Sequence, residues 1–308
     1  MNNRKMIEEF VCLCKMSQTK LKKEMFKKLT EIGYKPVEED GFLYAQGDIP
    51  ILLTAHLDTV HQKLVKSVNI KNRSGKTVIS SLQGIGGDDR CGVYMILNII
   101  KKYKCSVLFC EDEEIGCVGA NKFAQSQYIN DLSKLNYIIA LDRANAKDAV
   151  FYDCDNPEFT QFILSNTGYK EQFGSYSDIS EIAPQCGVAA VNLSCGYYHA
   201  HTTMEEVVWE DMLNTIKTVE KLIPTQSEQF EYIEAKYYFG NFDGYTPIDD
   251  YIAVYVQYYE DTELKEAIEY GTTQEAALLE FFQNHPDICY NDISWYDYLT
   301  TADEIYYG

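Results

Sequence analysis

The sequence lacks the features that mark membrane and secreted proteins. None of its apolar runs approaches the ~18 to 20 residues that a membrane-spanning helix requires. The segment that follows Met1 to Lys5 is amphipathic and interrupted by Glu8 and Glu9, whereas a signal peptide would have an apolar core there. We therefore expect a cytoplasmic protein with no membrane partner.

Positive charge is also scarce. The 308 residues include 27 Lys and Arg against 47 Asp and Glu, which gives a formal net charge of -20 at pH 7. An acidic surface repels phosphate groups and anionic lipid headgroups. The composition therefore argues against DNA, RNA or an anionic membrane as a partner.

A disulfide framework is not indicated, although the chain has ten cysteines. Cys91, Cys105 and Cys195 fall within expected helices and strands, where a free thiol behaves as a small buried hydrophobe. The pair Cys12-x-Cys14 lacks the two-residue spacer of a zinc knuckle or redox motif. We interpret these cysteines as packing residues.

The acidic charge is concentrated at the end of the chain. Residues 225 to 308 hold eighteen Asp and Glu against two Lys, and fourteen of the 25 tyrosines. So much aromatic content argues against disorder, and residues 264 to 270 and 274 to 282 have apolar side chains at helical spacing. We predict a catalytic domain over 1–224 and an acidic, tyrosine-rich accessory region over 225–308 that packs against it.

The first 224 residues alternate between expected helices and strands. Several short apolar runs are bounded by polar turns, which is typical of strands buried on both faces of a parallel sheet. Amphipathic spacing predicts helices between them. The pattern predicts an α/β fold of three layers, helix-sheet-helix, with a mostly parallel central sheet. The expected strands are 41–45, 51–55, 76–82, 105–110, 137–141 and 187–194, and the expected helices are 5–33, 89–103, 118–128, 158–165 and 209–222.

Residues of metal-binding type follow these apolar runs or open the helix after a glycine turn. Ligands gather at the carboxyl ends of strands in such sheets, so these side chains are expected to converge. A catalytic pair of metal ions, about 3.5 to 4 Å apart, needs one shared ligand and about two private ligands each. The residues that supply this number are His56, Asp88, Glu114, Asp142 and His201, and His199 competes for the last place.

Two further carboxylates are expected to support this site. Asp58 lies two positions after His56 on the same strand, so it points to the same side and can accept the second imidazole proton. Glu113 is next to Glu114 but should point differently, which leaves it free to act as a general base on a water molecule. The sequence therefore predicts metal-assisted hydrolysis.

Five blocks of the sequence, taken in order, resemble the co-catalytic di-zinc exopeptidases, the family of peptidase T, carboxypeptidase G and the related zinc aminopeptidases. The resemblance extends over about residues 4 to 222. Its blocks are Thr54-Ala55-His56-Leu57-Asp58-Thr59-Val60, Gly87-Asp88-Asp89-Arg90-Cys91-Gly92, Asp112-Glu113-Glu114-Ile115-Gly116, Leu141-Asp142 and His201-Thr202-Thr203-Met204-Glu205.

The resemblance implies a role for each ligand. Asp88 would bridge two ions, most often zinc with manganese or cobalt as alternatives; His56 and Asp142 would complete one site, and Glu114 and His201 the other. Glu113 would be the general base. It also implies a cis peptide between Asp88 and Asp89, and it selects His201 over His199, which would be a crevice residue.

A segment at Ser175 to Ile179 resembles the one that lines the substrate crevice in this family, which implies substrate contact for Asp178. Two intervals are too short for the lid, dimerisation or barrel-like insertions of many relatives: 59 residues from Asp142 to His201, and 32 from His56 to Asp88. We therefore expect a fold without a lid or dimerisation insertion, and the oligomeric state stays open.

We predict an aminopeptidase that acts on short peptides through a water shared by the two metal ions, with Glu113 as base. A deacylase or carboxypeptidase acting on N-acyl amino acids is an alternative, because the same metal core serves both reactions. A non-catalytic protein that uses its acidic tail to bind a basic partner is a third. The complete set of ligands plus a base counts against that third reading.

Overall fold

The fold was analysed in a computed structural model that describes residues 3–174, 176–235, 252–260, 263–271, 281, 284, 285, 288 and 293–299. The chain forms two compact units, Met1–Lys236 and Tyr237–Gly308. Within the described residues, no helix is both long enough and apolar enough to cross a membrane. Each unit is described by itself.

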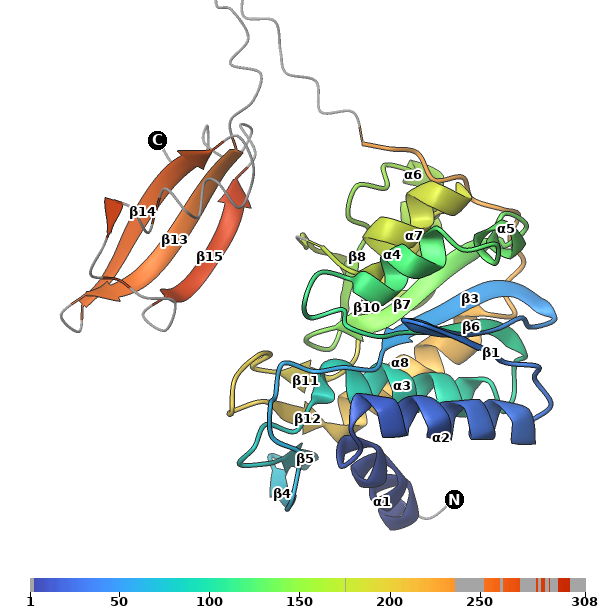
Figure 1. Ribbon diagram of the computed structural model, residues 1–308, viewed down its shortest axis with the longest axis horizontal. Coiled ribbons are helices and arrows are strands. Elements are labelled where there is room, and N and C mark those ends of the chain that lie inside the picture. Colours follow the sequence, from blue (N-terminus) through green and yellow to red (C-terminus); the bar gives the residue numbers. More distant parts are fainter. Residues whose placement is uncertain are drawn as a thin grey trace, which may run out of the picture. The chain divides into compact units, whose positions relative to one another are not determined.

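The first unit is built around a mixed sheet of eight strands, in the order β1-β2-β6-β3-β7-β10-β8-β9 (Figure 1). The four central strands β6, β3, β7 and β10 are parallel, while β2 and β8 join them antiparallel. This confirms the expected α/β architecture with a mostly parallel central sheet. The strands are β1 (Val37–Glu39), β2 (Phe42–Ala45), β3 (Ile49–His56), β6 (Cys105–Cys110), β7 (Tyr137–Arg143), β8 (Asp148–Val150), β9 (Lys170–Glu171) and β10 (Ala190–Ser194).

The central strands read as continuous apolar runs because both faces of the sheet are covered. In β7, Tyr137, Ile139 and Leu141 belong to one hydrophobic cluster, whereas Ile138 and Ala140 belong to a second cluster on the opposite face. All five side chains are buried. Alternate side chains of a strand point to opposite faces, so each strand contributes to both cores and needs no polar positions.

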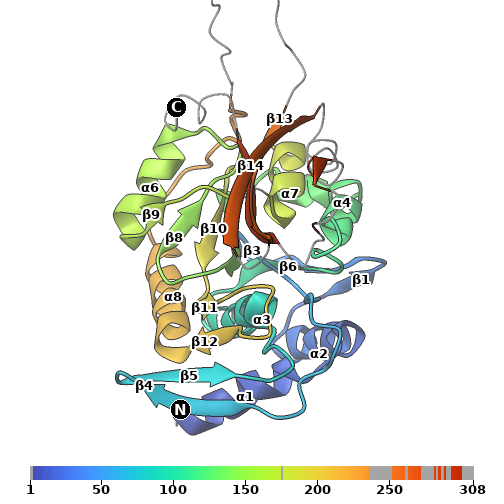
Figure 2. The same cartoon turned by 90° about the vertical axis from the view of Figure 1, so that its left-hand side faces the viewer.

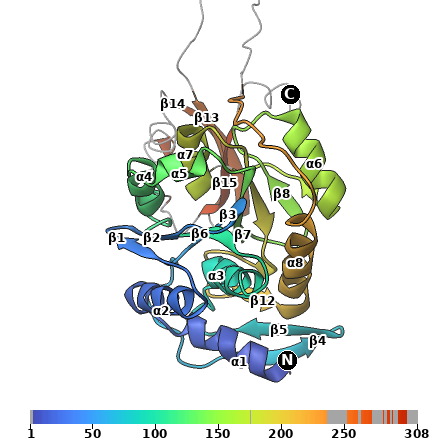
Figure 3. The same cartoon turned by 90° about the vertical axis from the view of Figure 1, so that its right-hand side faces the viewer.

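Helices form the two outer layers. Figures 1 and 3 show α2, α3 and α8 on one side of the sheet and α4, α5 and α7 on the other. Buried apolar side chains of α1, α2, α3, α6 and α8 contribute to the first hydrophobic cluster, and those of α4, α5 and α7 contribute to the second. The helices are α1 (Asn3–Cys14), α2 (Gln18–Glu31), α3 (Gly87–Ile99), α4 (Val118–Ala124), α5 (Ile129–Leu132), α6 (Pro157–Thr167), α7 (Asp178–Cys186) and α8 (Trp209–Leu222).

The first unit also has a second, antiparallel sheet of four strands, of which the sequence predicted only one. Its order is β11-β12-β5-β4, formed by β11 (Tyr197–Tyr198), β12 (Glu206–Val208), β5 (Lys76–Ser80) and β4 (Asn69–Arg73). Figures 2 and 3 show β4 and β5 alongside α1. All five residues of β4 are exposed and only Ile70 is apolar, so the strand shows no apolar pattern, and β11 and β12 are too short for a periodic one. Through β12 this sheet supports the segment that follows His201.

Residues just after position 224 belong to the first unit, which extends to Lys236. Phe230 donates its backbone N–H to the Asn136 carbonyl, and Tyr232 donates to Gly187. In the second unit, β13 (Ile252–Glu260) pairs antiparallel with both β14 (Glu263–Gly271) and β15 (Ile293–Leu299).

The helical expectation for residues 264 to 270 is therefore wrong. Over so short a segment, the apolar spacing does not distinguish a helix from a strand. These residues form a strand because they pair with β13, which is rich in β-branched and aromatic residues. The other expected helix, 274 to 282, lies outside the described residues except for Phe281. The division of roles between 1–224 and 225–308 stays a prediction.

Candidate metal centre

Five side chains of metal-binding type meet at the carboxyl edge of the main sheet. His56 ends β3, Asp142 lies near the end of β7, and Glu114 follows β6. Asp88 lies in the first turn of α3, and His201 lies in the turn between β11 and β12. The central strand β3 has β6 on one side and β7 on the other, so the chain crosses over in opposite directions there. Such a switch point opens a crevice for ligands.

Their donor atoms form two sets of three that share Asp88. The first set is His56, Asp88 and Asp142; the second is Asp88, Glu114 and His201; within each set the donor atoms all lie within 4.8 Å of one another. Oδ1 of Asp88 lies 2.8 Å from Nε2 of His56, and its Oδ2 lies 3.3 Å from Nε2 of His201. The two carboxylate oxygens of Asp88 thus face different sets.

The donor chemistry fits a pair of divalent cations. Imidazole nitrogen and carboxylate oxygen are the ligands that zinc takes in hydrolytic sites. Asp142 lies 3.3 Å from the His56 ring, and Glu114 lies 3.2 Å from the His201 ring. Oε1 of Glu114 is buried and has no hydrogen-bond partner, which is costly for a carboxylate unless a cation faces it.

Asp58 orients both His56 and the segment that carries Glu114. Its Oδ1 lies 3.1 Å from Nδ1 of His56, which leaves Nε2 facing the donor set. The same carboxylate accepts the backbone N–H groups of Glu113 and Glu114, each at 3.0 Å. Burial alone would raise the pKa of Asp58, but these hydrogen bonds and the His56 ring hold it below its ordinary value. Asp58 therefore links two strands that supply ligands.

Glu113 lies beside the ligands without joining either set. Its side chain is half-buried, and the Cys117 thiol donates to Oε1 at 3.7 Å. Burial raises the pKa of Glu113 to about 9, and the nearby carboxylates of Asp142, Asp178 and Asp88 add to the rise against the opposing effect of His56. A carboxylate in such surroundings has a strong affinity for a proton.

The matching protein-family model is peptidase family M28, and the match covers residues 44–199 of this chain. That interval contains His56, Asp88, Glu114 and Asp142, and His201 follows two residues after its end. The chain belongs to peptidase family M28. This membership makes it a hydrolase, a metallo-exopeptidase, and confirms the resemblance drawn from the five sequence blocks.

Solved structures share the fold of this M28 peptidase. Aminopeptidase PepT from Bacillus cereus superposes with a TM-score of 0.58 at 16% identity, over 72% of this chain and 98% of that one. A tripeptidase from Staphylococcus aureus gives a TM-score of 0.58 at 14% identity, over 72% and 98%. A Zn-dependent exopeptidase from Parabacteroides distasonis gives 0.51 at 14% identity, over 71% and 96%. No curated protein sequence matches the chain.

The backbone around Asp88 agrees with one expectation. The Asp88–Asp89 peptide is cis, as the resemblance implied. The next two side chains, Asp89 and Arg90, contact different backbone groups. Asp89 is buried and accepts the backbone N–H of His56 at 3.2 Å, while the Arg90 guanidinium donates to the carbonyls of Leu57 and Asp58. Both side chains stabilise the backbone around the metal centre of this M28 peptidase.

Several residues that orient Asp142 escaped the sequence prediction. Asn192 accepts the backbone N–H of Asp142 at 3.0 Å and donates to its Oδ2 at 3.3 Å. The Tyr197 hydroxyl donates to the Asp142 carbonyl oxygen at 2.7 Å. A single buried amide within the apolar run of β10 was the available signal for Asn192. No sequence signal identifies Tyr197, because its contact with Asp142 is formed only in the folded chain.

The two histidines near β11 differ in surroundings. Both adopt left-handed φ angles, 58° at His199 and 62° at His201, so neither lies on extended backbone. His201 reaches Asp88 and Glu114, whereas His199 is exposed and belongs to neither donor set. Its role as a substrate-binding residue stays a prediction.

Asp178 is the first residue of α7 and lies deep beside the centre. It is 4% exposed, its Oδ1 has no hydrogen-bond partner, and burial raises its pKa to about 6. Its charge contributes to the raised pKa of Glu113. Substrate contact for Asp178 stays a prediction, and Ser175 lies outside the described residues.

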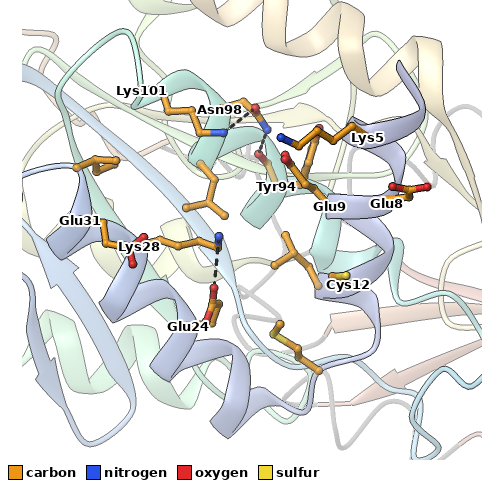
Figure 4. Close-up of a pocket in the computed structure, with 14 residues that line it drawn as sticks. Lys5, Glu8, Glu9, Cys12, Glu24, Lys28, Glu31, Tyr94, Asn98 and Lys101 are labelled. Atoms are coloured by element: carbon orange, nitrogen blue, oxygen red, sulfur yellow. Dashed lines mark hydrogen bonds and ion pairs between the residues drawn. The ribbon is translucent and has the colours of Figure 1, made fainter. Parts of the chain in front are cut away.

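A separate hollow of about 510 Å³ lies between α1, α2 and α3 (Figure 4). Charged side chains border it, among them Lys5, Lys28 and Lys101, and Lys28 pairs with Glu24. None of the residues that line it is a member of the two donor sets. It is therefore distinct from the metal centre.

Proposed function

We propose that this M28 peptidase is an aminopeptidase that acts on short peptides with a pair of divalent ions. The observation that carries the proposal is the geometry of Asp88, whose two carboxylate oxygens each face a different set of ligands. His56 and Asp142 would hold one ion, and Glu114 and His201 the other. Zinc is favoured by these ligand types, with manganese or cobalt as alternatives.

Two divalent metal ions, when bound, would polarise the scissile carbonyl and lower the pKa of a water molecule. The chain supplies the proton transfer. Glu113 takes a proton from the attacking water and returns it to the leaving amine. The Cys117 thiol donates a hydrogen bond to Oε1 of Glu113, which leaves Oε2 free to accept from the water. The positive charge of bound ions would oppose the rise in the pKa of Glu113, so its carboxylate could accept the proton and hold it until the amine receives it.

Free amino termini are the favoured substrates for electrostatic reasons. Besides the residues of the donor sets, the carboxylates of Glu113 and Asp178 lie beside the centre, and neither belongs to a donor set. A negative potential attracts a protonated amine and repels an additional carboxylate. Two of the structures with this fold are described as an aminopeptidase and a tripeptidase, which supports the same choice.

A paired set of chromogenic substrates tests the proposal. Aminoacyl p-nitroanilides should be hydrolysed, and their N-acetyl counterparts should be poor substrates because acetylation removes the positive charge. A chelator should abolish the activity, and added zinc, manganese or cobalt should restore it. Preferential hydrolysis of N-acyl amino acids would instead favour a deacylase or carboxypeptidase, and activity insensitive to the chelator would refute a metal-dependent reaction.

A further inference from the structure

One fully buried carboxylate outside the donor sets contacts the backbone that carries the shared ligand. Glu205 is 0% exposed and lies just before β12. Its Oε2 accepts the backbone N–H of Gly86 at 2.6 Å, and its Oε1 accepts that of Asp88 at 3.0 Å. Both oxygens of this side chain thus bind the turn that leads into α3.

The same residue also closes the turn that contains His201. The backbone N–H of Glu205 donates to the Thr202 carbonyl at 3.1 Å, one residue beyond His201. Glu205 therefore contacts two of the three segments that supply the second donor set, those of Asp88 and His201, one through its side chain and one through its backbone. These two segments are more than 100 positions apart in the sequence, and the paired strands β5 and β12 lie next to them.

A histidine completes the surroundings of this carboxylate. Nε2 of His61 lies 2.8 Å from Oε2 of Glu205, and the His61 ring is 9% exposed. The ring fits against Gly84: a Cβ atom at that position would lie 2.1 Å from Cε1 of His61. A buried carboxylate is costly unless all its oxygens are hydrogen-bonded, and here two amides and an imidazole satisfy them.

We propose that Glu205 is a positioning residue for the metal centre, which fixes Asp88 so that its two oxygens face His56 and His201. The inference rests on the metal-binding function proposed above. Without the two amide contacts, the turn at Gly86 and the backbone of Asp88 would be free to shift, and the shared carboxylate would lose its alignment. Residues that orient metal ligands typically contribute about 10- to 100-fold to metal affinity.

The test is zinc titration into the metal-free full-length chain, measured by competition with a chromophoric chelator. Glu205→Gln keeps the side-chain shape, but the amide can accept only at one end and places an NH2 group against a backbone N–H. We expect an affinity for Zn²⁺ about 10- to 100-fold below wild type. Glu206→Gln is the matched control, because Glu206 is the next carboxylate and pairs with Arg73 on the second sheet. The affinity of this control variant for Zn²⁺ should equal that of the wild type.

Thermal unfolding of the metal-free variants separates positioning from general stabilisation. A loss of affinity in folded Glu205→Gln supports the proposal, whereas wild-type affinity for both ions overturns it, whatever the melting temperature. If Glu205→Gln does not fold, Glu205→Asp decides: it keeps the charge, but it is one methylene shorter and cannot reach both amides, so its affinity should also fall. Wild-type affinity in that variant overturns the proposal. Absence of zinc binding by the wild-type chain would instead refute the proposed function.

Discussion

Replacement of Glu113 by glutamine is expected to lower kcat by about 10²- to 10⁴-fold, the usual contribution of a general base. Glutamine has nearly the same shape and can still receive the Cys117 thiol, but it cannot take a proton from water. Glu113 belongs to neither donor set, so the metal content should stay close to wild type. The measurement is kcat on an aminoacyl p-nitroanilide, with metal content determined on the same sample.

Asp112→Asn is the control for this substitution. Asp112 is the adjacent carboxylate, it contacts Gln18, and its left-handed φ of 60° is one that asparagine adopts readily. It should retain wild-type kcat and metal content. Near-normal turnover by Glu113→Gln would show that another group acts as the base.

Replacement of Asp88 by alanine is expected to remove both metal and activity. Its two oxygens contact both histidine ligands, so the substitution takes one donor from each set. The activity should fall to the background rate, and metal should be lost on dialysis. Metal analysis and kcat, measured on one preparation, distinguish this outcome from that of Glu113→Gln.

Asp40→Ala provides a control at the surface, because Asp40 is exposed and its carboxylate pairs with Lys122, away from both donor sets. It should keep both metal and activity. Retention of a full complement of metal by Asp88→Ala would contradict the shared-ligand geometry.

The parts of the fold that could be predicted are those in which one local pattern decides. Buried parallel strands such as β7 require apolar residues at every position, so their runs stand out. Helix α8 was predicted with its observed bounds because its apolar stripe is strong and regular. The five side chains of the two donor sets could be expected to converge because each follows a strand or opens a helix at one edge of a parallel sheet.

The parts that could not be predicted depend on contacts between distant segments. Helix α7 contains Pro184, which weakens its sequence signal. Glu205 is one of two consecutive glutamates, Glu205 and Glu206, and only the fold buries the first and pairs the second with Arg73. The left-handed φ at His201 likewise follows from tertiary structure, because residues other than glycine adopt such angles only uncommonly.

The number of metal ions per chain tests the central claim most directly. Two donor sets that share Asp88 should hold two divalent ions. The measurement is elemental analysis of the full-length chain after saturation with zinc and removal of unbound metal, at a known protein concentration. We predict a ratio close to two, which falls to near zero in Asp88→Ala. A wild-type ratio of one or below would contradict the paired-metal account.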